Sequence, residues 1–101
     1  MALKLRLDPQ AKRDLADIRG YLIENAGTGT AERVRKHLRG RINLLPERPL
    51  IGVATSEPGI RILAPTRYPY RIYYTVTDDA IVILHIRHTA RREPESGDFT
   101  R

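Results

Sequence analysis

The chain has 101 residues, with 41% hydrophobic and 30% charged residues, which is the size and balance of one globular domain. Eighteen Lys and Arg against 12 Asp and Glu give a net charge of +6, so the expected partner is acidic. The absence of cysteine excludes disulfides and thiolate chemistry, the apolar run at 80–84 is too short to span a membrane, and the first residues lack a signal-peptide pattern, so we expect a cytoplasmic protein.

A short strand and a helix are the first predicted elements. Leucines alternate with charged residues over 3–7, which is typical of a strand with one buried face. Asp8 and Pro9 follow, and these residue types are preferred at the N-cap and at the first position of a helix. The helix is predicted to run to about Asn25. Its apolar residues at helical spacing are Ala11, Leu15, Ile18 and Leu22.

A second helix is predicted after the break at residues 27–29, with Thr28 or Thr30 as its cap. It ends at Pro46, and the short link between the two helices predicts an antiparallel helical hairpin. The apolar stripe of this second helix consists of Ala31, Val34, Leu38, Ile42 and Leu45.

Three strands are predicted after a proline-rich loop over 46–59. They cover 60–63, 70–76 and 80–87, and a turn at 78–79 joins the last two. This turn places Tyr74 opposite Ile83 and Ile72 opposite His85 on one face of the sheet. The opposite face is predicted to carry Arg71, Tyr73, Thr75, Val82 and Leu84.

The order of elements predicts an α+β fold: an N-terminal strand, an antiparallel helical hairpin, and a three-stranded antiparallel segment forming one small sheet. The two helices are expected to cover one face of that sheet. A single domain over 1–92 and a polar C-terminal tail over 93–101 complete the predicted organisation.

Two groups of basic residues are candidate interaction surfaces. No acidic residue stands between Glu32 and Glu47 on the second helix. Arginine binds carboxylates and phosphates through its planar fork, whereas the alternative is a solvated surface that only keeps the protein soluble. The helix group consists of Arg33, Arg35, Lys36 and Arg39. The group at the end of the sheet consists of Arg61, Arg71, Arg87, His88, Arg91 and Arg92.

The sequence lacks the motifs of the common catalytic and cofactor sites. It has no glycine-rich phosphate loop and no serine nucleophile elbow. His85 and His88 should point to opposite faces of their strand, so we expect no metal and no cofactor. Four tyrosines between residues 68 and 74 are interpreted as packing residues, with stacking on nucleic-acid bases as the alternative.

From about Leu5 to Arg92 the chain resembles the RelE/ParE superfamily of toxins from bacterial type II toxin–antitoxin systems. The resemblance depends on the order and spacing of several segments and implies a helical hairpin packed on a small antiparallel sheet. These segments are 9–18, 21–22, 44–45 with Pro49 and Gly52, 59–61, 70–74 and 81–88.

The superfamily has two main branches with different targets. ParE-like members inhibit DNA gyrase and so block replication, whereas RelE-like members cut messenger RNA on the ribosome. The residues after His88 resemble the ParE-like ending, which implies a gyrase inhibitor without catalytic residues. In the nuclease alternative, Arg71 would contact the phosphate, Arg61 would assist and His88 would transfer a proton.

The resemblance also implies a cognate antitoxin whose acidic, apolar segment neutralises the toxin within a hetero-oligomer. The net charge of +6 gives that association a physical basis, since an acidic disordered segment is attracted and then ordered on binding. A third alternative is a degenerate, non-toxic binding module that acts with the antitoxin in regulating its own operon.

Overall fold

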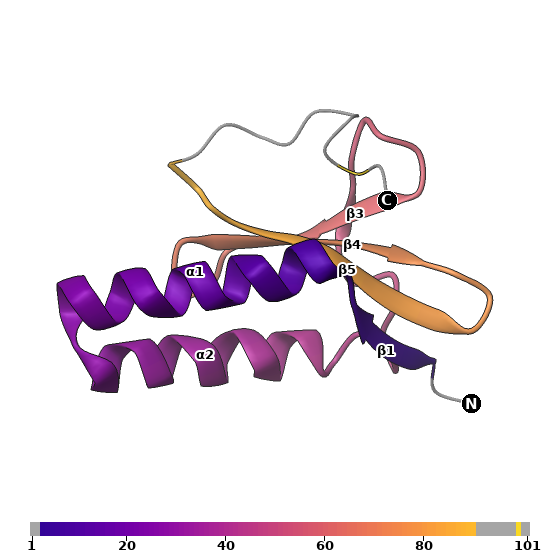
Figure 1. Cartoon of the computed structure of the whole chain (residues 1–101). Coiled ribbons are helices and arrows are strands. Elements are labelled where there is room, and N and C mark those ends of the chain that lie inside the picture. The colour runs from indigo at the N-terminus through magenta and orange to yellow at the C-terminus, as the bar shows by residue number, and fades with distance from the viewer. Residues whose placement is uncertain (1–2, 91–98, 100–101) are drawn as a thin grey trace.

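The N-terminal part of the chain forms one strand and a pair of helices in the computed structural model, which describes residues 3–90 and 99 (Figure 1). Asp8 is the N-cap of the first helix, as predicted, and its side chain accepts the backbone N–H of Gln10 at 3.2 Å. The elements are β1 (Lys4–Leu7), α1 (Pro9–Ala26) and α2 (Thr28–Ile42).

Gly27 alone joins the two helices, because it is both the C-cap of α1 and the N-cap of α2. The prediction that Thr28 or Thr30 caps α2 is wrong. The chain must reverse within one residue, and Gly27 does so at φ 92°, a conformation that glycine adopts without steric cost. The antiparallel hairpin itself is confirmed.

The remaining strands complete a single five-stranded sheet with the order β1-β5-β4-β3-β2. The ranges predicted for the last three strands are confirmed to within one residue. The two-residue β2 was not predicted, because it is too short to leave a sequence pattern. β1 pairs with β5 in parallel and the other pairs are antiparallel, so the sheet is mixed. The four strands are β2 (Val53–Ala54), β3 (Ile60–Leu63), β4 (Tyr70–Val76) and β5 (Ala80–His88).

A β-bulge interrupts the pairing of β4 with β5. Tyr74 lies opposite Ile83, as predicted, but Ile72 lies opposite Ile86 and not opposite His85. The two strands shift register between Tyr73 and Tyr74, so that one extra residue is accommodated in β5. His85 is therefore paired with Tyr73, and Ile86 takes the inward position predicted for His85.

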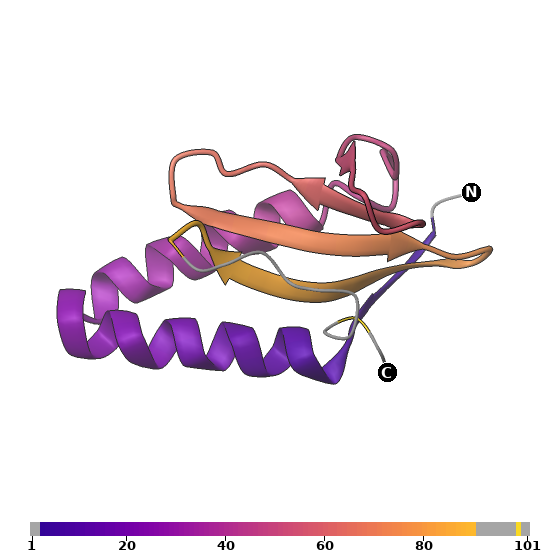
Figure 2. The same cartoon turned by 90° about the horizontal axis from the view of Figure 1, so that it is seen from above.

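Both helices cover the same face of the sheet, as Figures 1 and 2 show. Tyr70, Ile72 and Tyr74 of β4 belong to the main core on this helix-facing side. So do Val34, Leu38 and Ile42 of α2 and Leu45, which follows the end of α2. A smaller apolar cluster on the outer face contains Ala80, Val82 and Leu84 of β5, with Ile60 and Phe99 packed against it. Tyr70, Tyr73 and Tyr74 are buried, which confirms their packing role.

The loop after α2 is fixed to the sheet by three hydrogen bonds around Tyr74. The Gly52 N–H donates to the Tyr74 hydroxyl at 2.9 Å, and that hydroxyl donates to the Pro49 carbonyl at 2.8 Å. Arg61 Nη1 donates to the Gly52 carbonyl at 2.7 Å. Burial raises the pKa of Tyr74, so the hydroxyl keeps the proton that it donates.

Asp14 of α1 covers the part of β5 that β1 does not reach. The last backbone bond from the β1 side joins the Asp8 N–H to the Ile83 carbonyl. Further along β5, the Ile86 N–H donates instead to Asp14 Oδ2 at 2.9 Å, while Gln10 Nε2 donates to Asp14 Oδ1 at 2.8 Å.

Replacing Asp14 with alanine is expected to lower the free energy of unfolding by about 1–3 kcal/mol, because a buried N–H would lose its acceptor. Asp17→Ala is the matched control, since Asp17 is exposed on the same helix and should change stability by less than about 0.5 kcal/mol. Urea unfolding measures both variants. Equal midpoints for the two variants would contradict the role assigned to Asp14.

Candidate functional site

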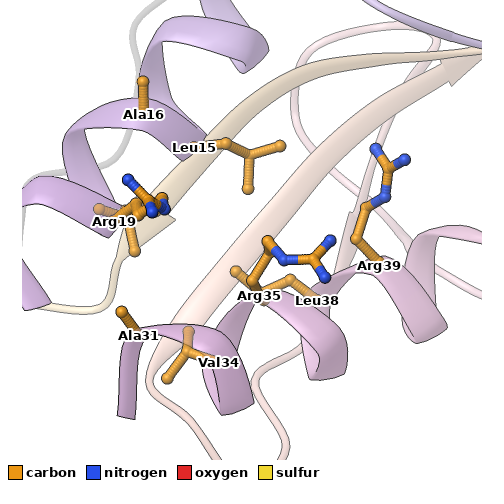
Figure 3. A pocket seen from close by; sticks show the side chains of 9 residues that line it. Leu15, Ala16, Arg19, Ala31, Val34, Arg35, Leu38 and Arg39 are labelled. Carbon is orange, nitrogen blue, oxygen red and sulfur yellow. The ribbon is translucent and has the colours of Figure 1, made fainter. Parts of the chain in front are cut away.

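A groove of about 290 Å³ lies between α1 and α2 (Figure 3). Its floor is apolar, and arginines from both helices stand at its rim. Leu15, Ala16 and Ile18 of α1 and Ala31, Val34 and Leu38 of α2 form the apolar part, and the arginines are Arg19, Arg35 and Arg39.

Small side chains between the helices leave this groove open. Ala16 and Ala31 lie along it from opposite helices, and neither is large enough to fill the space between the two helices. Leu15 and Ile18 are only partly buried, so α1 keeps apolar surface accessible within the groove. The arrangement suits an apolar segment that completes the packing of the hairpin.

The rim of the groove is positively charged. Arg35 Nη2 lies 2.6 Å from Glu32 Oε1, and its hydrogen bond lowers the pKa of that carboxyl group. Both side chains are about half exposed, and such surface pairs contribute little to stability, so Arg35 can exchange Glu32 for another carboxylate. Neither Arg19 nor Arg39 makes an ion pair within the part of the chain that the structure describes.

The basic residues predicted on the second helix divide between two positions. Arg35 and Arg39 line the groove, whereas Arg33 and Lys36 are exposed outside it. Arg33 Nη2 donates to Thr30 Oγ1 at 3.0 Å. Arg19 was not predicted, although its place directly after Ile18 on α1 is a signal that an arginine could stand beside the apolar stripe.

The predicted group at the end of the sheet is divided between the two faces. Arg71 of β4 and Arg87 of β5 lie opposite each other. Because their neighbours Ile72 and Ile86 face the helices, both arginines lie on the outer face of the sheet. Arg61 pairs with Tyr74 and therefore lies on the helix-facing side. The group does not form one cluster. Arg91 and Arg92 lie outside the described residues.

His88 is also on the helix-facing side, where its ring meets Tyr70 edge-to-face at 5.4 Å between centroids. The Ala90 N–H donates to His88 Nδ1 at 2.9 Å, which fixes the ring against the backbone after β5. Among residues 3–90 and 99, no three His, Cys, Asp or Glu side chains gather in a way that could hold a metal ion. The same residues include no helix of the length and apolar character needed to cross a membrane.

A match to a sequence family covers nearly the whole chain. Residues 5–93 match the family described as "ParE toxin of type II toxin-antitoxin system, parDE". None of the curated protein sequences compared with this chain matches it.

Several solved toxin structures share the fold. A chain of the chromosomal ParDE toxin–antitoxin system from P. aeruginosa superimposes with a TM-score of 0.78 at 22% identity, covering 86% of this chain and 96% of that one. A mutant of the E. coli toxin RelE in the free state has a TM-score of 0.66 at 18% identity, covering 89% of this chain and 86% of that one. A chain of the intact E. coli RelBE toxin–antitoxin complex has a TM-score of 0.57 at 21% identity, covering 90% of this chain and 100% of that one.

Proposed function

Because the chain belongs to the ParE toxin family of type II toxin–antitoxin systems, we propose that it inhibits DNA gyrase and so blocks DNA replication. The family match over residues 5–93 is the observation that carries this proposal. Gyrase acts on the chromosome, so the proposed site of action is the cytoplasm. The fold similarity to the ParDE system of P. aeruginosa supports the same branch.

The placement of three residues supports gyrase over messenger RNA as the target. A nuclease that uses Arg61, Arg71 and His88 together needs them around one phosphate. Arg71 lies on the outer face of the sheet, whereas Arg61 and His88 lie on the helix-facing side. Arg61 also donates to the Gly52 carbonyl, which gives its guanidinium a structural partner. These three side chains do not converge on one reacting group.

The groove between α1 and α2 is the proposed binding site of the antitoxin. Its apolar floor fits the apolar side chains of an amphipathic segment, and the three rim arginines fit the acidic residues beside them. The charge of +6 accelerates the encounter with such a segment. Neutralisation by an acidic antitoxin is thus consistent with the chemistry of this surface.

The test uses purified toxin freed from its antitoxin. We expect it to block the supercoiling of relaxed plasmid by gyrase and to leave messenger RNA on translating ribosomes intact, since the proposed target is a protein. Gel electrophoresis of the plasmid and primer extension on the message measure the two activities. Cuts in the message with normal supercoiling would establish the nuclease alternative, and normal growth after induction would establish the non-toxic module.

A further inference from the structure

Four large apolar side chains stand exposed close together in sequence, three in the loop after α2 and one at the start of β2. Among the described residues only Tyr21 is a comparably exposed large hydrophobic residue, and it lies on α1. Leu50 and Val53 are 65% and 67% exposed, and Leu44 and Ile51 are about half exposed. We call these four residues the 44–53 patch. None of them lines the groove between the helices.

Buried residues and backbone hydrogen bonds hold the segment that carries this patch in place. Leu45 and Gly52 are buried, and the Gly52 backbone is bonded to the Tyr74 hydroxyl and to Arg61. Turn hydrogen bonds from Arg48 N–H to the Leu44 carbonyl and from Ile51 N–H to the Arg48 carbonyl fix the residues between them. The apolar side chains are therefore presented by an ordered backbone, which lowers the entropic cost of binding.

The charge around the patch differs from that of the groove. Residues 43–59 contain one basic residue, Arg48, and two acidic residues, Glu47 and Glu57. A phosphate backbone or an acidic antitoxin segment would find little attraction here. Arg61 of β3 also reaches this segment, where its guanidinium donates to the Gly52 carbonyl, so two basic and two acidic residues are balanced here. Exposed apolar residues without an excess of basic residues are typical of contacts with the apolar surface of another protein.

An open sheet edge continues the patch. β2 is the outermost strand, and the Thr55 N–H points inward to the Ile60 carbonyl at 3.0 Å. Because backbone groups alternate along a strand, the N–H and carbonyl of Ala54 point away from β3. An extended segment can therefore pair with the Ala54 backbone, and its apolar side chains would then lie next to Val53 on the same strand.

We propose that the 44–53 patch is the surface through which the toxin holds its protein target, by adding an extended apolar segment of that target to β2. The inference rests on the proposed function in that the target is a protein. It assigns target binding and antitoxin binding to different surfaces of the chain.

Single variants Leu50→Asp and Val53→Asp of the full chain test the proposal, with Tyr21→Asp, at a site 63% exposed, as the matched control. We expect each patch variant to need at least about tenfold more protein for the same inhibition of gyrase supercoiling, and to relieve growth arrest after induction. Their affinity for the cognate antitoxin should change less than about threefold. Tyr21→Asp should behave as wild type in all three assays.

Urea unfolding checks that each variant is folded, and Leu50→Gln with Val53→Thr replaces any variant that is not. Growth arrest by the wild type without gyrase inhibition would refute the gyrase target, and the growth assay would still test the patch. Patch variants as inhibitory and toxic as the wild type would overturn the proposal. A wild-type dimer that dissociates on Leu50→Asp would also overturn the proposal, since a second copy of the chain would then occupy the patch. A wild type that does not arrest growth would overturn it as well.

Discussion

Replacing Gly52 with alanine is expected to lower the free energy of unfolding by about 3 kcal/mol. A Cβ at this position would lie 2.6 Å from the Tyr74 hydroxyl oxygen and 2.8 Å from the Ile62 carbonyl oxygen. Both groups are fixed, one in the buried network around Tyr74 and one in the backbone of β3, so neither can move away cheaply. The urea-unfolding midpoint at neutral pH measures the loss.

Gly40→Ala is the matched control, because a Cβ there meets no atom within 4 Å and Gly40 lies inside α2. Alanine in a helix is more favourable than glycine by about 0.5–1 kcal/mol, so this variant should be more stable than the wild type. The two substitutions add the same methyl group with opposite expected signs. A Gly52→Ala protein as stable as the wild type would show that the loop after α2 is not held against Tyr74.

Reversing the charge of the groove is expected to weaken antitoxin binding by about 100-fold. The double variant Arg35→Glu with Arg39→Glu lowers the net charge by four and places two carboxylates at the rim where acidic side chains of the antitoxin are proposed to bind. Both a slower association and a faster dissociation should contribute. Surface plasmon resonance at two salt concentrations measures the two rates.

Arg33→Glu with Lys36→Glu is the control with the same change in net charge, since both residues lie on α2 outside the groove. This variant should lose only long-range attraction, so its effect should be confined to the association rate and should fade at high salt. Equal loss of affinity in the two double variants would place antitoxin binding elsewhere on the basic surface.

The local elements of the fold could be predicted because local signals specify them. Asp8 and Pro9 marked the start of α1, and the residues of β3 and β4 had the right pattern and boundaries. The bulge opposite Tyr73 was not predictable, since nothing in β5 alone says that it carries one more residue than its partner needs. β1 pairs in parallel with β5, which lies more than 70 residues further along the chain. A local sequence pattern does not specify such a long-range partner.

The candidate site was predicted in part for similar reasons. Arg35 and Arg39 were identified from the run of basic residues on the second helix, but the groove also needs Arg19 and the small Ala16 of the other helix. A cavity depends on the sizes of side chains that meet in space, and a helical stripe read by itself does not reveal them. Arg61 and Arg71 were expected to act together because strand order alone does not tell which face each residue takes.

The pairing of β1 with β5 has a consequence for how the nascent chain reaches its native state. Lys4 is the register partner of Ala80, so the first strand has no place in the sheet until residue 80 has been synthesised. At about 5–20 residues per second, translation of the intervening chain takes about 4–15 s. Throughout that interval the leucines of β1 lack their final partners, and the sheet is completed only after β5 has been synthesised.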